Sequence, residues 1–171
     1  MSITLSAIAR TQLDQLYRAL DIILEKAEAH VSARGGDEAV LLDWRLTPDM
    51  LPLIRQVQLV SDFTVRGLSR LAGVDPVSMP DEETSLGDLR AHIDKARDAV
   101  WALDEDAISS DPASDITFPA GKDRSMTLPR QAYLQNFVLT NALFHASTTY
   151  AILRSVGVEL GKADIMGMRQ N

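Results

Sequence analysis

Long runs of apolar residues at helical spacing constrain the fold of this chain more than any other feature of its sequence. From Leu5 to Val31, apolar residues return every three or four positions and line one face of a helix. Similar patterns cover residues 50–72, 85–107 and 129–156. Each of these four helices must bury its apolar face against the others, so the sequence predicts an all-α four-helix bundle.

The segments between these helices carry turn residues and no sign of a second domain. Two glycines after Arg34 predict the end of the first helix, and Pro48 disfavours helix just before the second. The stretch "SDPASDITFPAGKDRSMTLP" predicts a small β-hairpin before the last helix, with Ile116–Phe118 facing Ser125–Thr127. Without internal repeats, a chain of 171 residues fits a single domain over residues 1–171.

The composition excludes several classes of function. A net charge of −7 would repel a phosphate backbone, so no nucleic acid is expected as a partner. No apolar run reaches the roughly 20 residues that cross a bilayer, so no membrane partner is expected. The first residues lack the pattern of a secretory signal, which predicts a cytoplasmic location. The absence of cysteine removes disulfides, thiolate metal ligands and cysteine nucleophiles.

The last helix places polar residues where its buried face should be. Asn141, His145 and Thr148 lie between Val138 and Ile152 on one stripe. A buried amide or imidazole that lacks a partner costs about 1 to 3 kcal/mol. We therefore expect these side chains to meet hydrogen-bond partners, water or a ligand inside the bundle.

The second helix offers matching polar residues. Asp49 and Gln56 share one stripe of that helix, and Gln56 is the natural hydrogen-bond partner of His145. Phe137 and Phe144 would supply apolar walls beside them. Two interpretations stay open at this point: a satisfied internal network that fixes the helix register, or a pocket in which His145 acts as acid or base.

Two longer motifs carry a family resemblance that spans nearly the whole chain. The phrases "RLTPDMLPLIRQVQLVSDF" and "FHASTTYAILRSVGVELGKADIMG" resemble the domain-of-unknown-function family numbered 1993, a branch of the DinB-like superfamily. The resemblance implies a four-helix bundle of up-down-down-up order that is frequently a homodimer. It also implies relatives that are metal-dependent enzymes or thiol-dependent transferases and isomerases, with three histidines around a divalent metal.

The chain departs from that histidine pattern. In the resembling family, one histidine comes from the second helix and an H-x-x-x-H pair comes from the fourth. His145 matches the second member of the pair, Asn141 occupies the place of the first, and Gln56 lies near the remaining position. One imidazole with two neutral amides is a poor ligand set for zinc or nickel, so we expect no metal and no cofactor. Should a metal bind, His145 with Asp49 and Gln56 would hold it.

Other titratable residues have simpler interpretations. His92 is expected at the surface of the third helix, paired with Asp88, and Asp62 with Arg66 is expected to form a solvated ion pair. Ile165 and Met166 in the tail "GVELGKADIMG" are expected to plug the bundle end, with a lid over its mouth as the alternative.

These observations leave three hypotheses for function. The first is a metal-independent protein that binds an unknown small molecule, or a degenerate enzyme, with His145 as the candidate catalytic residue. The second is a divalent-metal-dependent hydrolase or a thiol-dependent transferase or isomerase, and the third is a non-catalytic structural bundle. Under the first hypothesis the residues that line the pocket are Asp49, Gln56, Asn141, Phe144, His145 and Thr148.

Overall fold

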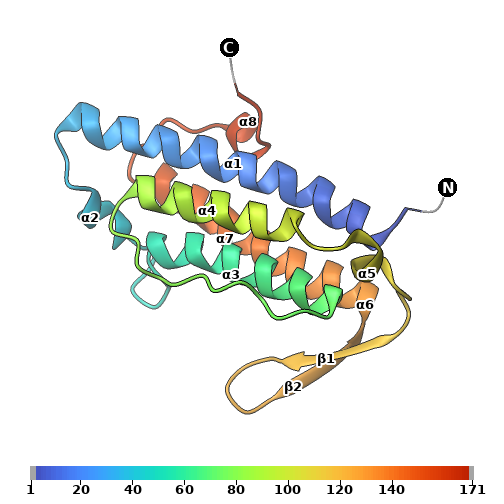
Figure 1. Ribbon diagram of the computed structural model, residues 1–171. Coiled ribbons are helices and arrows are strands. Elements are labelled where there is room, and N and C mark those ends of the chain that lie inside the picture. Colours follow the sequence, from blue (N-terminus) through green and yellow to red (C-terminus); the bar gives the residue numbers. More distant parts are fainter. Residues whose placement is uncertain (1–2, 170–171) are drawn as a thin grey trace.

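Four long helical segments form the body of the protein, and Figure 1 shows them packed along one another. The computed structural model describes residues 3–169. The long helices are α1 (Leu5–Arg34), α3 (Leu53–Ala72), α4 (Leu86–Trp101) and α7 (Thr140–Ser155). In Figure 1, α1 and α7 run in one direction while α3 and α4 run in the other, which confirms the predicted up-down-down-up bundle.

The ends of α1 follow from its local sequence. The hydroxyl of Thr4 accepts a hydrogen bond from the backbone N–H of Ala7 at 3.2 Å, which caps the first turn. Gly35 ends the helix with a φ of 60°, a conformation that favours glycine. The short helix α2 (Glu38–Leu42) follows and buries Leu41 and Leu42 at one end of the bundle.

The third long helix is shorter than its apolar spacing predicts. Ser85 caps α4 as expected, accepting from the N–H of Asp88 at 3.0 Å, but the helix ends at Trp101. The side chain of Asp104 then accepts from the N–H of Asp106 at 2.9 Å and starts a separate helix, α5 (Glu105–Ser109). The prediction of one helix to residue 107 was wrong because this aspartate caps a new start.

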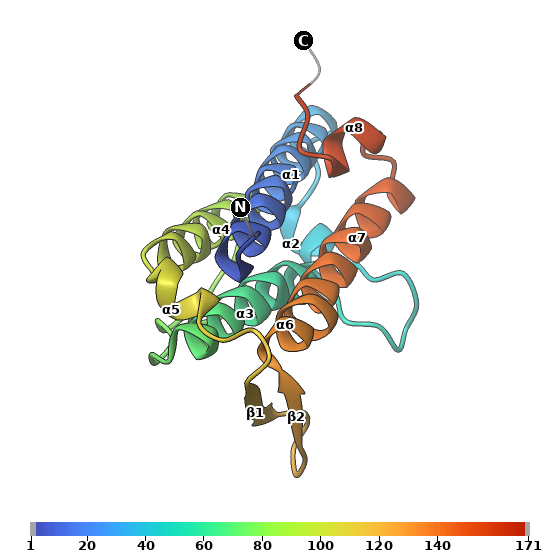
Figure 2. The ribbon, with the colours of Figure 1, turned by 90° about the vertical axis from the view of Figure 1, so that its right-hand side faces the viewer.

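The predicted β-hairpin is present, although its strands are longer than predicted and Ile116–Phe118 face Met126–Leu128 rather than Ser125–Thr127. Strand β1 (Asp115–Pro119) pairs antiparallel with β2 (Ser125–Pro129), and Thr117 lies opposite Thr127. The ring of Phe118 points into the protein and lies 4.5 Å, between centroids, from the ring of Tyr133. Figure 2 shows the hairpin projecting from the bundle next to α6 (Arg130–Ala132). The hairpin therefore adds an aromatic side chain to the core at the start of the last helix.

The last helix contains a segment that the sequence did not predict. Between α6 and α7, residues Tyr133–Leu139 form the π-helix η1. This segment packs closely on α3, because a Cβ added to Gly67 would lie 2.6 Å from a methyl carbon of Val138. Single-turn π segments inside α-helices occur frequently at functional sites.

The tail folds back along α1 and ends in α8 (Lys162–Ile165), at the edge of the bundle seen in Figure 2. Val158 and Leu160 of the tail are buried in the core and Ile165 packs against it, whereas Met166 is 37% exposed. Asp164, which is 1% exposed, adds a polar contact. The carboxylate of Asp164 lies 2.7 Å from Nζ of Lys26. Among residues 3–169, no helix is both long and apolar enough to span a bilayer.

Candidate functional site

A hydrogen bond between α3 and α7 lies at the centre of the candidate site. Nδ1 of His145 is 2.8 Å from Oε1 of Gln56, and both side chains are buried. The amide of Gln56 also donates from Nε2 to the backbone carbonyl of Leu51 at 3.0 Å. The predicted partnership of these two residues is therefore present.

The second hydrogen bond of Gln56 fixes the proton on His145. A carbonyl oxygen only accepts, so the NH₂ group of Gln56 must face Leu51 and its Oε1 must face the imidazole. Nδ1 of His145 consequently carries the hydrogen, and the lone pair of the neutral ring is at Nε2. Within residues 3–169, Nε2 makes no hydrogen bond and is not among the enclosed polar atoms, so it meets solvent.

Aromatic rings enclose the imidazole on two sides. Phe63 from α3 stacks on His145 with 5.5 Å between centroids and 16° between ring planes. Phe144 makes an edge contact at 5.1 Å. Burial lowers the pKa of His145, because a charged imidazole loses more hydration there than a neutral one. His145 is therefore held as a neutral base at neutral pH.

The other predicted residues of α7 are satisfied by their own helix. The amide of Asn141 donates to the carbonyl of Phe137 at 2.7 Å, and the hydroxyl of Thr148 donates to the carbonyl of Phe144 at 2.8 Å. Thr148 is buried, whereas Phe144 is 56% exposed. Phe144 therefore covers one edge of His145 from the surface and is not an inner wall.

Asp49 does not reach the other predicted residues. It lies exposed in the loop before α3, where its carboxylate accepts from the hydroxyl of Thr47 at 2.5 Å. This hydrogen bond lowers the pKa of Asp49. The expectation that Asp49 turns inward is wrong, because Thr47 two residues earlier supplies a local partner.

The donor atoms near His145 do not fit the divalent metal that the family resemblance implies. Oε1 of Gln56 already accepts from Nδ1 of His145, and the amide of Asn141 is directed at the carbonyl of Phe137. Among the described residues, no group of three or more histidine, aspartate or glutamate side chains is arranged to hold a metal ion. One free imidazole nitrogen is left, which is not a zinc or nickel ligand set.

A cleft adjoins this centre through Phe63. We call it the α3–η1 cleft: a cavity of about 250 Å³ between α3, η1 and the end of β1. Its lining includes Asp62, Phe63, Arg66, Arg70, Tyr133 and Phe137. His145 lies behind Phe63, since neither this cavity nor the other well-formed cavities of the described residues include His145 in their lining. The sequence predicted a pocket lined by the imidazole, whereas the adjoining cavity is lined by Phe63, which stacks on His145, and not by His145 itself.

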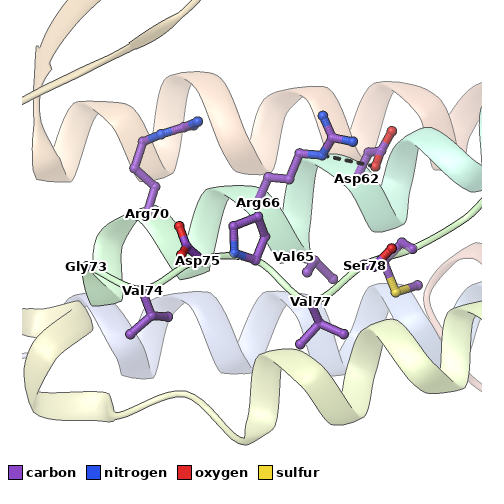
Figure 3. Close-up of a pocket in the computed structure, with 11 residues that line it drawn as sticks. Asp62, Val65, Arg66, Arg70, Gly73, Val74, Asp75, Val77 and Ser78 are labelled. Atoms are coloured by element: carbon purple, nitrogen blue, oxygen red, sulfur yellow. Dashed lines mark ion pairs between the residues drawn. The ribbon is translucent and has the colours of Figure 1, made fainter.

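A larger cavity continues from the same side chains. It measures about 840 Å³ and lies between α3 and the loop of residues 73–79, and it shares Asp62, Arg66 and Arg70 with the α3–η1 cleft. Figure 3 shows Arg66 and Arg70 extending from α3 in the same direction, with Arg66 paired to Asp62. The expected Asp62–Arg66 pair is present at 3.3 Å, but burial raises the pKa of Asp62 and its side chain is only 20% exposed.

A second buried histidine was not expected. His92 is 7% exposed and pairs through Nδ1 with Glu83, and Glu83 also accepts from Nε2 of Gln58 at 2.6 Å. The other ring nitrogen of His92, Nε2, is enclosed and has no hydrogen-bond partner within residues 3–169. The prediction of a surface pair with Asp88 was wrong, because the loop before α4 brings Glu83 against the ring.

Comparisons with known proteins agree with this fold. A family profile described as "Domain of unknown function (DUF1993)" matches residues 5–166. The chain is also similar to a solved crystal structure of a DinB family member protein from Shewanella denitrificans. That match has a TM-score of 0.85 and 30% sequence identity, and it covers 98% of this chain and 96% of the other. No curated protein matches the sequence.

Proposed function

The chain belongs to the DUF1993 family of DinB-like helical proteins, and from that premise we propose that it is a metal-independent protein that binds a small molecule in the α3–η1 cleft. The observation that carries this proposal is the double role of Phe63. One face of its ring stacks on His145, and the side chain also lines the cleft. The imidazole thus supports a wall of the cavity that a ligand would touch.

The chemistry of the lining supports binding more than turnover. The cleft combines aromatic walls with a few charged groups, which is the usual character of small-molecule sites. His145 is a positioning residue in this account, because it reaches the cleft only through Phe63. A neutral Nε2 that is not fully enclosed leaves the degenerate-enzyme interpretation as a variant of the same proposal.

The proposal is tested by NMR with protein that has been freed of metal by a chelator. Single-ring fragments with acidic, neutral and basic substituents are added while the aromatic signals of Phe63, Phe137 and Tyr133 are followed. Saturable shifts of these signals are expected for at least one fragment. Folded protein whose spectrum no fragment changes would contradict the proposal.

The same samples separate the alternatives. Binding that needs added zinc or nickel would favour the metal-dependent hydrolase or thiol-dependent transferase instead. A structural bundle predicts no binding and a His145→Leu variant that is more stable than the wild type, since apolar packing can replace a buried polar network at little cost. The homodimer and the cytoplasmic location stay predictions, and light scattering tests the first of them.

A further inference from the structure

We propose that the α3–η1 cleft takes a small carboxylate that carries a single aromatic ring, with benzoate as the simplest member of the class. This inference rests on the proposed function and names the ligand class for the same cleft. Three features of the cleft carry it: the spacing of its aromatic walls, the unfilled N–H groups of two arginines, and the position of one aspartate.

The walls and the volume fit one ring. Phe63 and Phe137 meet edge to face with 5.7 Å between centroids, and Phe137 stacks on Tyr133, also at 5.7 Å. Offset and edge contacts with such rings stabilise a further aromatic ring. A cavity of about 250 Å³ holds roughly eight water volumes of about 30 Å³ each. That space accommodates a single ring with one small substituent.

Arg70 offers donors beside this ring position. Its Nη1 donates to the hydroxyl of Tyr133 at 2.7 Å, which fixes the direction of the guanidinium. The remaining N–H groups of Arg70 make no hydrogen bond within residues 3–169. A planar guanidinium held in this way matches the two oxygens of a carboxylate.

Arg66 adds a second guanidinium one helical turn earlier. Its Nε lies 3.3 Å from the carboxylate of Asp62, and its side chain is 65% exposed, so its Nη groups are available to a ligand. Figure 3 shows both arginines extending to the same side of α3. Two guanidiniums and one aspartate give these three residues a net positive charge, which favours an anion over a cation.

Asp62 supplies a test that distinguishes ligand charge. Its side chain is 20% exposed and lines the same cavity, so it repels a bound carboxylate and attracts a bound ammonium group. Removing its charge while keeping its shape should therefore strengthen the binding of an anion. The same change should weaken the binding of an amine.

The experiment measures the affinity of the full chain for benzoate, benzyl alcohol and benzylamine by NMR titration. The wild type is expected to bind benzoate about tenfold more tightly than benzyl alcohol, because hydrogen bonds to charged groups are the stronger ones. Arg66→Gln and Arg70→Lys should each lose most of that preference. Asp62→Asn should bind benzoate several-fold more tightly.

Arg18→Gln is the matched control, because Arg18 lies exposed on α1 and its loss changes the net charge by the same amount. This variant should bind benzoate like the wild type. Equal binding of benzoate and benzyl alcohol, or tighter binding of benzylamine, overturns the carboxylate assignment and leaves the proposed function standing. If none of the three compounds binds and the other ring fragments fail as well, both proposals fall together.

Discussion

The ring of Phe63 lies within 16° of parallel to the ring of His145, with 5.5 Å between the centroids. The two rings join the polar centre of the bundle to the α3–η1 cleft. The stacked pair also sets the position of the wall that Phe63 forms. The polar residues on the inner stripe of α7 are thus connected to a cavity, although they do not line it.

Replacing Phe63 should weaken fragment binding. In Phe63→Leu the wall keeps its apolar character but loses its ring, which should cost about 1 kcal/mol, or roughly fivefold in affinity. The matched control is Phe144→Leu, since Phe144 touches the other side of His145 and does not line the cleft. NMR titration with the best fragment measures both variants, and equal losses in the two would argue against the cleft as the binding site.

Gln56 and His145 should behave as a coupled pair in unfolding experiments. Gln56→Leu leaves the buried N–H of the imidazole without an acceptor, which should reduce the free energy of unfolding by about 1 to 3 kcal/mol. In the double variant with His145→Leu, neither member of the pair is left without the other, so the loss should be smaller than the sum of the two single changes. Urea titrations of the four proteins measure this, and strictly additive losses would show that the hydrogen bond contributes no coupling.

Burial of His145 should make stability fall on mild acidification. Its pKa is lowered in the folded protein, so the unfolded chain binds the proton more tightly. The stabilising contribution is therefore complete above the pKa of an unfolded histidine, about 6.5. It decreases as the pH falls below that value and is lost once the pH has passed the lower pKa of the folded state.

The measurement is the free energy of unfolding between neutral and mildly acidic pH, for the wild type and two variants. His145→Leu should remove this part of the pH dependence. His30→Gln should keep it, because His30 lies near the end of α1, away from the α3–α7 interface. Unchanged pH dependence in the His145 variant would mean that the imidazole is not held neutral by burial.

Gly67 should resist even a small substitution. A Cβ at this position would lie 2.6 Å and 2.8 Å from the two methyl carbons of Val138, a β-branched side chain with little freedom to move. Gly67→Ala should reduce stability by about 1 to 3 kcal/mol through overpacking, despite the better helix propensity of alanine. Adding Val138→Ala should recover part of this loss, and thermal unfolding of both variants tests the contact.

The sequence predicts most of the fold because helical periodicity directly reports which face is buried. Periodicity anticipated the four long helical segments, turn residues and strand patterns anticipated the hairpin with strands at 116–118 and 125–127, and the family resemblance implied the order of the helices. The π-helix η1 was not predicted from the apolar spacing, and it lies against α3 where a Cβ on Gly67 would meet Val138. The helix start at Asp104 could have been predicted from the sequence, because an aspartate followed by two further acidic residues is a typical start of a helix.

The candidate site was only partly predictable. The contact between Gln56 and His145 followed from two polar positions on facing stripes. The exposed position of Asp49 was not predicted, because its side chain takes a local partner, Thr47, in the loop. The paths of loops were equally unreadable, so the contact of Glu83 with His92 was missed. Arg66 and Arg70 lie one turn apart on α3, so their proximity follows from helical spacing, and only the fold adds the aromatic side chains of η1 beside them.

The most direct test of the account is the protonation of His145 in metal-free protein, measured by long-range ¹H–¹⁵N NMR correlations above the pKa of its ring. We predict a protonated Nδ1, held by Gln56, and an unprotonated Nε2, with both signals unchanged by an equimolar amount of zinc. A proton on Nε2, or a shift of the Nε2 signal as zinc is added, would contradict the hydrogen-bond arrangement and the metal-independent site that follows from it.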